Sequence, residues 1–283
     1  LREGAAIGDF KRPDRIVIGA EDDFGREIMS EVYRPLFLNE SPILFTGRRT
    51  SELIKYAANA FLATKITFIN EMADLCEKVG ANVQDVSRGI GMDNRIGSKF
   101  LHAGPGYGGS CFPKDTLALL KTAEDYDSPT RIVESVVKAN ESRKRAMGRK
   151  VLDAIGGLND ARGKKVALLG LTFKPNTDDM RDSPAIAIVQ TLQDAGAVVH
   201  AYDPEGMPNA SQMFEDVVYF DDPYAAMKDA EGLAIVTEWD EFRALNLTKV
   251  QSLLKGLVLV DLRNIYDRGE LEMLGIKYVA VGR

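Results

Sequence analysis

The segment Val166-Ala167-Leu168-Leu169-Gly170 decides the fold of the second half of this chain, because it is a short apolar run that ends at a glycine. Uninterrupted apolar runs of this length are typical of strands that are buried on both faces of a sheet. Further strands are predicted at 198–202, 232–236 and 257–262, and a helix is predicted at 184–195. Strands that alternate with helices indicate an α/β fold with a parallel, doubly wound sheet.

A long amphipathic segment precedes this sheet and runs from Thr50 to Gly80. Its apolar residues recur at spacings of three and four, which predicts one continuous helix. A helix of roughly thirty residues is about 45 Å long, which suits a connection between two domains and a possible dimer interface. Shorter helices are predicted at 83–90, 116–125 and 129–154.

The first 48 residues predict a small βαβ unit, with strands at 15–19 and 41–46 and a helix at 22–38. No Gly-x-Gly-x-x-Gly motif stands between a predicted strand and the helix that follows it, and the chain does not begin with Met. We therefore expect this part to be the remnant of a nucleotide-binding domain whose glycine fingerprint lies upstream.

Composition excludes several classes of protein. The 283 residues include 36 basic and 42 acidic side chains, with no basic run of the kind that binds nucleic acid. Apolar runs are too short to span a membrane and no signal peptide is recognised, so we expect a cytoplasmic protein. Two cysteines and two histidines are too few for a disulfide framework or a zinc cluster, and we expect no metal.

The most informative motif is a glycine-rich stretch that ends in a thiol and then a lysine and an aspartate: Gly104-Pro105-Gly106-Tyr107-Gly108-Gly109-Ser110-Cys111-Phe112-Pro113-Lys114-Asp115. Glycines let a ligand approach the backbone closely. A cation and a carboxylate three and four residues after Cys111 would lie near it if the segment turns helical, and would assist proton transfer. The alternative is a buried thiol beside a structural turn. Core packing is the expected role of Cys76.

Three segments of the chain, taken together, resemble the UDP-glucose 6-dehydrogenases, within the UDP-glucose/GDP-mannose dehydrogenase family. They are the cysteine loop with the preceding Asp93-Asn94-Arg95-Ile96-Gly97 and Phe100-Leu101, the stretch at 51–60, and the stretch at 169–181. The resemblance covers nearly the whole chain. It implies three parts: the end of an NAD-binding Rossmann domain at 1–48, a central helical dimerisation domain with the cysteine loop at 49–158, and a Rossmann-like UDP-sugar-binding domain at 159–283. A homodimer or higher homo-oligomer is implied as well.

The resemblance also implies NAD-dependent four-electron oxidation of UDP-glucose to UDP-glucuronate. Cys111 would attack the aldehyde to form a thiohemiacetal, and a thioester would then be hydrolysed. Lys55 and Asn59, one helical turn apart, would stabilise the oxyanion. Lys55 interrupts an apolar stripe, so we expect it to be partly buried; a solvated helix face is the alternative. Asp115 would act through water as general base, or else cap a helix.

Binding residues follow from the same resemblance, and one of them, Arg95, would reach the substrate of a partner subunit. The residues implied for the substrate are Glu3, Lys55, Arg95, Phe100, Leu101, Gly104, Gly108, Phe173, Lys174 and Arg263. Those implied for NAD are Glu3, Lys114 and Arg181. Plain surface charge is the alternative interpretation of the lysines and arginines.

Two other functions remain open at this point. A GDP-mannose or UDP-N-acetylhexosamine dehydrogenase would share the lysine, asparagine and cysteine, although the run from Cys111 to Asp115 favours the glucose enzyme. A non-catalytic nucleotide-sugar binding fragment is the alternative from another class. A glutamate and a threonine that the family places upstream are absent here, so we expect the chain alone to be inactive.

Overall fold

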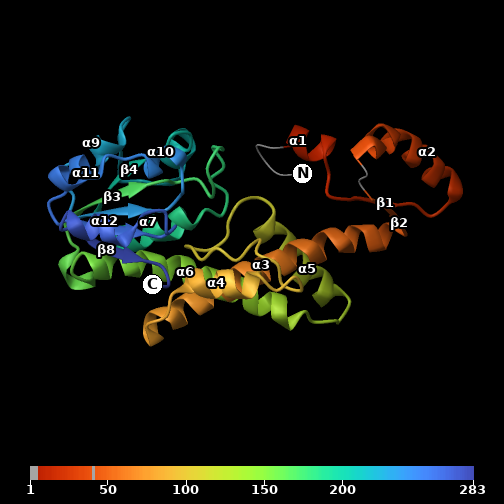
Figure 1. The fold of residues 1–283 in the computed structure, drawn as a ribbon, viewed down its shortest axis with the longest axis horizontal. Coiled ribbons are helices and arrows are strands. Elements are labelled where there is room, and N and C mark those ends of the chain that lie inside the picture. Colours follow the sequence, from red (N-terminus) through yellow and green to blue (C-terminus); the bar gives the residue numbers. More distant parts are fainter. Residues whose placement is uncertain (1–5, 40–41) are drawn as a thin grey trace. The chain divides into compact units, whose positions relative to one another are not determined.

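The computed structural model describes residues 6–39 and 42–283, which divide into two compact units, Leu1–Phe61 and Leu62–Arg283 (Figure 1). The predicted α/β class with parallel sheets is confirmed. The predicted division into three domains is not tested by this separation into units and stays a prediction. Each unit is described by itself.

The first unit contains a small parallel βαβ arrangement. Strands β1 (Ile16–Gly19) and β2 (Ile43–Thr46) pair in parallel, and α2 (Asp23–Tyr33) lies between them in the chain, after the short helix α1 (Ala6–Lys11). The helix was expected to continue to residue 38 but ends at Tyr33 and tightens into a 3₁₀ helix, Arg34–Asn39. Pro35 explains this end, because proline cannot donate the hydrogen bond that would continue an α-helix.

Helix α3 (Arg48–Val79) is the long helix predicted from the apolar spacing, and it is continuous. In the second unit it buries small and branched residues on one face, among them Ala63, Ile69 and Ala73. The other helices of this region are α4 (Val83–Gly91), α5 (Phe112–Asp125), α6 (Arg131–Ala154) and the 3₁₀ helix Leu158–Asp160.

A six-stranded parallel sheet forms the rest of the second unit, in the order β5-β4-β3-β6-β7-β8. The strands are β3 (Lys165–Leu169), β4 (Val198–Tyr202), β5 (Val217–Tyr219), β6 (Gly232–Ile235), β7 (Val258–Asp261) and β8 (Lys277–Ala280). From β3 the chain adds β4 and β5 on one side, and it then returns to add β6, β7 and β8 on the other side, so the strand order switches between β3 and β6. In doubly wound sheets ligands bind beyond the carboxyl ends of the strands at this switch point.

Helices cover both faces of the sheet (Figure 1). Val166 and Leu168 of β3 pack with α6 and with α7 (Pro184–Asp194) on one face, whereas Ala167 and Leu169 pack on the other. This alternation follows from the two-residue period of a strand. The remaining helices are α8 (Met207–Met213), α9 (Pro223–Met227), α10 (Asp240–Arg243), α11 (Leu247–Leu253) and α12 (Arg268–Met273).

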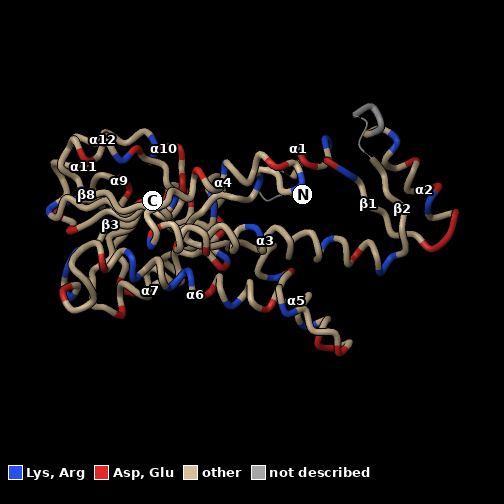
Figure 2. Tube along the Cα trace, turned by 60° about the horizontal axis from the view of Figure 1, so that its bottom comes forward, with Lys and Arg blue, Asp and Glu red and all other residues tan. Residues whose placement is uncertain are grey.

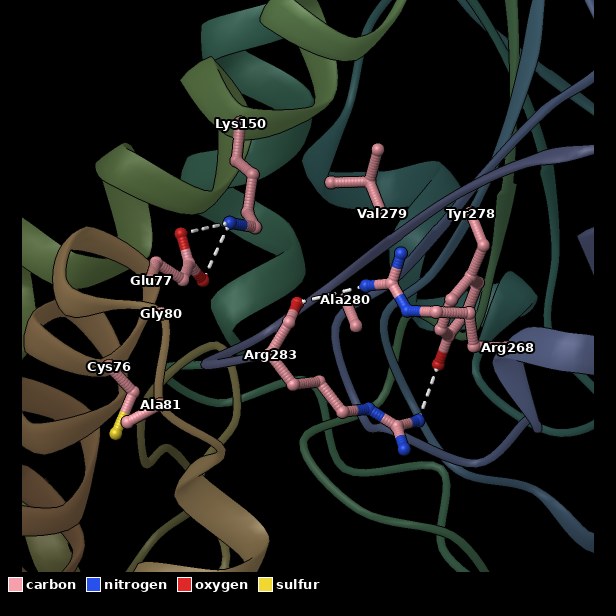
Figure 3. A pocket seen from close by; sticks show the side chains of 10 residues that line it. All are labelled: Cys76, Glu77, Gly80, Ala81, Lys150, Arg268, Tyr278, Val279, Ala280 and Arg283. Atoms are coloured by element: carbon pink, nitrogen blue, oxygen red, sulfur yellow. Dashed lines mark hydrogen bonds and ion pairs between the residues drawn. The ribbon is translucent and has the colours of Figure 1, made fainter.

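The residues that follow β8 form hydrogen bonds with the helices of the second unit. The N–H of Gly282 donates to Glu77 on α3 at 2.8 Å, and its carbonyl accepts from the N–H of Val83 at 2.8 Å. Glu77 also pairs with Lys150 of α6 at 2.7 Å, beside a cavity of about 330 Å³ (Figure 3). The sheet and the helices therefore share one compact unit.

Charged residues of both signs are interspersed along the chain (Figure 2). Within the residues that the structure describes, no helix combines the length and apolar character needed to cross a membrane.

Candidate active site

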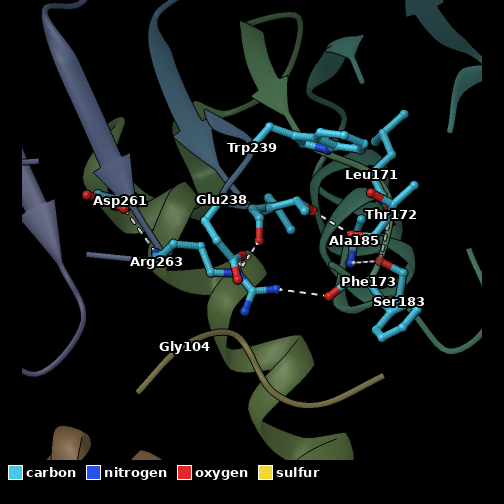
Figure 4. Close-up of polar contacts among 12 residues, drawn as sticks. Gly104, Leu171, Thr172, Phe173, Ser183, Ala185, Glu238, Trp239, Asp261 and Arg263 are labelled. Atoms are coloured by element: carbon cyan, nitrogen blue, oxygen red, sulfur yellow. Dashed lines mark hydrogen bonds and ion pairs between the residues drawn. The ribbon is translucent and has the colours of Figure 1, made fainter. Parts of the chain in front are cut away.

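Arg263 lies beyond the carboxyl end of β7 and joins the loops that follow β3 and β6 (Figure 4). Its Nε donates to the carbonyl of Val236 at 2.6 Å and lies 3.0 Å from Glu238 Oε2, while Nη2 donates to the carbonyl of Phe173 at 3.3 Å. The side chain is only 16% exposed, so its interpretation as a plain surface charge is wrong. Lys174 places Nζ 5.3 Å above the ring of Phe173 and is half-buried.

Asp203 organises the loop that carries Phe173. It follows β4, is fully buried, and its Oδ2 accepts from the N–H of Leu171 at 2.7 Å, the N–H and hydroxyl of Thr172, and Trp239 Nε1 at 3.1 Å. Its Oδ1 accepts from the N–H of Gly206 at 2.7 Å. A buried carboxylate with this many donors is well satisfied and rigid. The sequence placed Asp203 at a strand end but did not reveal this role.

The cysteine loop packs directly on the loop that follows β3. The N–H of Gly109 donates to the carbonyl of Arg181 at 2.8 Å, and a Cβ on Gly109 would lie 2.6 Å from the Phe173 ring. A Cβ on Gly108 would lie 2.3 Å from the carbonyl oxygen of Asp182. Gly108 is thus required by contact with the protein's own backbone, and its approach to a sugar stays a prediction. Gly104 lies beside Arg263, and a Cβ added there would be in ordinary van der Waals contact with Nη1 at 3.5 Å.

Cys111 is exposed and immediately precedes α5, with the Ser110 hydroxyl 3.7 Å from its sulfur. The helix was expected from residue 116 but begins at Phe112, because Pro113 fits the first turn of a helix. The partial positive charge of a helix N-terminus suits a nucleophile that reacts as an anion. The alternative of a buried thiol at Cys111 is therefore wrong, and Cys76 is buried as expected.

Asp115 lies in the first turn of α5 and is 3% exposed. Its N–H donates to the carbonyl of Cys111 at 2.9 Å, and Lys114 Nζ lies 3.5 Å from Oδ1. Asp115 does not occupy the cap position, which belongs to Cys111, so the cap interpretation is wrong. The Lys114 side chain is 75% exposed.

Phe100 and Leu101 precede the glycine loop. Phe100 has φ of 64°, a left-handed conformation that is uncommon for an aromatic residue, and its ring lies 6.1 Å from that of Phe112. Strain of this kind is concentrated at functional sites. Leu101 is 2% exposed and, with Arg263, borders a cavity of about 610 Å³. His102 and Arg243 also line this cavity; sequence reasoning gave neither of them a site role.

Arg95 and Arg181 each contact the carboxylate of a residue two positions earlier in the chain, in addition to the contact of Arg263 with Glu238. Arg95 contacts both oxygens of Asp93, at 2.6 Å for Nη2, and this hydrogen bonding lowers the pKa of Asp93 and raises that of Arg95. Arg95 is 89% exposed. Arg181 makes a similar contact with buried Asp179, at 2.8 and 2.9 Å, and its side chain is 61% exposed.

Lys55 and Asn59 belong to the first unit, one turn apart on α3. Asn59 is half-buried, whereas Lys55 is exposed, so the expectation that it is partly buried was wrong. Both residues have interactions in the structure. Glu3 lies outside the described residues. The structure thus brings together the loop from Gly104 to Cys111 with Phe173, Arg181 and Arg263, and places Arg95 apart from these contacts.

The described residues meet only part of what NAD requires. Lys114 and Arg181 present exposed cations that fit a pyrophosphate. The spacing Gly104-x-Gly106-x-x-Gly109 does match the dinucleotide fingerprint by letter, but it follows α4 and a loop, so it lacks the strand-to-helix setting of that motif. In the described ranges, no group of three His, Cys, Asp or Glu side chains is placed to hold a metal ion.

Comparison with known proteins agrees with this arrangement. The central-domain model of the UDP-glucose/GDP-mannose dehydrogenase family matches residues 49–142, and the UDP-binding-domain model of the same family matches residues 167–268. Together they cover well over half of the chain. The chain belongs to the UDP-glucose/GDP-mannose dehydrogenase family.

Individual relatives point the same way. The chain is 68% identical to a UDP-glucose 6-dehydrogenase of Rhizobium meliloti strain 1021, over 100% of this chain and 65% of the relative. It is 45% identical to a UDP-glucose 6-dehydrogenase of Bacillus subtilis strain 168, over 100% of this chain and 60% of the relative. The solved structure of a Pyrobaculum islandicum UDP-glucose dehydrogenase superimposes with a TM-score of 0.86 at 37% identity, covering 99% of this chain and 61% of that one. The chain thus spans less than two thirds of the length of these relatives.

Proposed function

We propose that this chain carries the central and UDP-sugar-binding parts of an enzyme that oxidises UDP-glucose to UDP-glucuronate with NAD. The observation that supports this most directly is an exposed thiol, Cys111, at the start of α5, in a loop packed on Phe173 at the ligand-binding edge of the sheet. The family to which the chain belongs and the relatives named above support the same reaction.

In this proposal, the chain's residues hold the sugar nucleotide and form the covalent bond. Phe173, Lys174 and Arg263 contact the nucleotide, and the backbone of the glycine loop contacts the sugar. Cys111 attacks the aldehyde carbon, and Lys55 and Asn59 stabilise the oxygen that becomes negatively charged. Asp115 moves protons through a water molecule. Lys114 and Arg181 would hold the pyrophosphate of NAD, which would supply the hydride acceptor for the two oxidation steps, one NAD molecule for each.

The test is turnover of the full-length protein on a panel of nucleotide sugars. UDP-glucose should yield two NADH for each UDP-glucuronate formed, with no free aldehyde released. GDP-mannose or a UDP-N-acetylhexosamine as the preferred substrate would favour the related dehydrogenases. Binding of the nucleotide sugars without NADH formation would favour a non-catalytic binding protein.

We also propose that the protein forms homo-oligomers. In the second unit, α3 exposes Phe68 (46%), Leu75 (52%) and Val79 (65%), which recur at spacings of seven and four on one face. Large exposed apolar residues that form a stripe mark interaction surfaces. Arg95, which is highly exposed, would reach the substrate of a partner. The prediction that the protein works in the cytoplasm stays a prediction.

A further inference from the structure

The backbone of the glycine loop lies between helices without forming regular secondary structure. Residues 104–109 are all buried and belong to no helix or strand. Buried backbone N–H and C=O groups need hydrogen-bond partners, and here the loop cannot find them in a ladder. Side chains from α3 and α6 provide them for Gly104 and Tyr107, whereas the N–H of Gly109 donates to the backbone carbonyl of Arg181.

Asn140 of α6 satisfies both backbone groups of Tyr107. Its Oδ1 accepts from the N–H of Tyr107 at 2.9 Å, and its Nδ2 donates to the carbonyl at 3.1 Å. Asn140 is 2% exposed. A side-chain amide offers a donor and an acceptor together, so it pairs with the peptide as a neighbouring strand would.

Gly104 is held in the same way by two side chains. Asn70 Oδ1 of α3 accepts its N–H at 2.9 Å, and Arg143 Nε of α6 donates to its carbonyl at 2.7 Å. Arg143, 5% exposed, also donates to the carbonyl of Asn70 at 3.1 Å and to Asp74 at 2.7 Å. Four hydrogen bonds thus tie two loop residues to two helices.

Tyr107 packs against the first residue of α5, Phe112. Its ring lies 5.9 Å from the ring of Phe112 in an edge-to-face arrangement, within a cluster with Ala63 of α3 and Val136 of α6. Phe112 is the first residue of α5 and directly follows Cys111. A shift of Tyr107 would therefore move the thiol.

We propose that Asn140, Arg143 and Asn70 are positioning residues that hold the glycine loop and thereby place Cys111 for attack. This rests on the proposed function, because the placement matters only if the thiol reacts. A purely structural role in joining α3 to α6 would be shared by Lys150, which bridges these helices by donating to both carboxylate oxygens of Glu77.

The test compares Asn140→Ala and Arg143→Lys with Lys150→Ala as the matched control, all in the full-length protein. Three quantities are measured: amide exchange of peptides that cover 102–112, the rate at which iodoacetamide labels the Cys111 peptide relative to the Cys76 peptide, and kcat and KM on UDP-glucose. Melting temperatures show whether each variant is folded.

We expect faster exchange of the loop amides in Asn140→Ala and Arg143→Lys, a changed labelling rate at Cys111, and kcat about 10- to 100-fold lower with a much smaller change in KM. Lys150→Ala should lower the melting temperature and leave the other quantities near wild type. Unchanged loop exchange, or faster exchange with unchanged labelling and kcat, would overturn the proposal.

Arg143→Lys is the milder change and decides the matter if Asn140→Ala does not fold; Asn70→Ala provides a third variant. If the wild-type protein does not oxidise UDP-glucose, the proposed function fails, while exchange and labelling still show whether these side chains hold the loop and Cys111. Equal effects of Lys150→Ala and Asn140→Ala on the loop would overturn the positioning role.

Discussion

Cys111 and Cys76 differ in the properties that govern thiol chemistry. Cys111 is exposed and precedes a helix of fourteen residues, whereas Cys76 is 4% exposed and lies within α3. Accessible thiols at helix N-termini are reactive, and thiols packed in an apolar core are inert. The two residues therefore provide a matched pair for testing covalent catalysis.

Replacing Cys111 by alanine in the full-length protein should abolish UDP-glucuronate formation and change UDP-glucose affinity little, because the loop is proposed to contact the sugar through its backbone. Product formation and calorimetric binding measure the two effects. Cys76→Ala is the control and should lose stability, by about 1–3 kcal/mol for a small core cavity, without losing the reaction. Wild-type rates of acid formation in Cys111→Ala would rule out the covalent route.

Asp261 shows how burial affects a titrating residue at the same edge of the sheet. It is fully buried at the end of β7, where it accepts hydrogen bonds from the N–H groups of Arg263 and Tyr266 and from the Tyr278 hydroxyl at 2.9 Å. Burial raises the pKa of this carboxyl above its ordinary value of 3.8, and the hydrogen bonds oppose the shift only in part.

This raised pKa predicts a pH dependence of stability. Between the unfolded pKa of Asp261 and its higher folded pKa, the folded protein binds more protons than the unfolded chain, so its contribution to stability falls as pH rises. We expect Asp261→Asn to remove this contribution. Urea unfolding of both proteins between about pH 4 and pH 7 measures the difference. An unchanged pH slope in Asp261→Asn would show that the residue titrates as an exposed carboxyl does.

At the scale of elements, the contact between the cysteine loop and the loop after β3 links the thiol to the sheet edge that is proposed to bind the nucleotide. Gly109 has φ of 81° and faces the Phe173 ring. Gly157 has φ of 93° and has no neighbour within 4 Å of an added Cβ. Comparing alanine substitutions at the two glycines therefore distinguishes the cost of the left-handed backbone from the effect of the contact with Phe173.

Alanine at either glycine should cost about 1 kcal/mol of stability from the left-handed backbone. Gly109→Ala should in addition displace Phe173 or the loop, because real Cβ atoms do not approach a ring to 2.6 Å. We expect UDP-glucose affinity at least about 10-fold weaker, an effect of 1.4 kcal/mol, in Gly109→Ala and nearly unchanged in Gly157→Ala. Equal affinities, measured by calorimetry, would show that the contact does not shape the site.

Sequence patterns predicted the elements whose periodicity is strong and local. Both ends of β4 were predicted, at 198 and 202, and α3 was placed within two residues. The start of α5 and the end of α2 were misplaced around Pro113 and Pro35. The three-residue strand β5 and the strand β8, both at sheet edges, were not predicted.

The sequence predicted only some of the residues of the candidate site, because only some of them lie close together in the chain. The motif that contains Cys111 is contiguous, so its residue types reveal the chemistry. Asn140 lies 33 residues from Tyr107, and Asp203 lies 32 residues from Leu171. Hydrogen bonds between such distant positions leave no periodic signal in one sequence, so these partners emerged only from the structure.

At the scale of the whole molecule, the described residues offer more of the features expected of a UDP-glucose site than of an NAD site. The loops around Arg263 and Phe173 contact each other at the edge proposed to bind UDP-glucose, and Arg263 also borders a cavity of about 610 Å³. For the proposed NAD site, the described residues offer two exposed cations, Lys114 and Arg181, without the strand-to-helix glycine turn that normally cradles a pyrophosphate.

The 283-residue chain should therefore bind UDP-glucose weakly, bind NAD at least about 10-fold more weakly still, and form no NADH. Calorimetry with each ligand and absorbance at the NADH band provide the measurements. UDP alone is the control, because it should retain much of the affinity if the contacts lie at the sheet edge. Tight NAD binding, or turnover, would contradict this prediction.

The hydrogen bonds of Gly282 have a consequence for how the protein is made. Glu77 and Val83, near the end of α3 and the start of α4, obtain these partners from a residue about two hundred positions later in the chain. During synthesis at about 5–20 residues per second, the helices emerge at least roughly ten seconds before that partner exists. Contacts of such long range also slow folding, because a large loop must close first. A ribosome that stalls before residue 282 would therefore release helices that lack these hydrogen bonds, and such chains should be preferred substrates for chaperones and proteases.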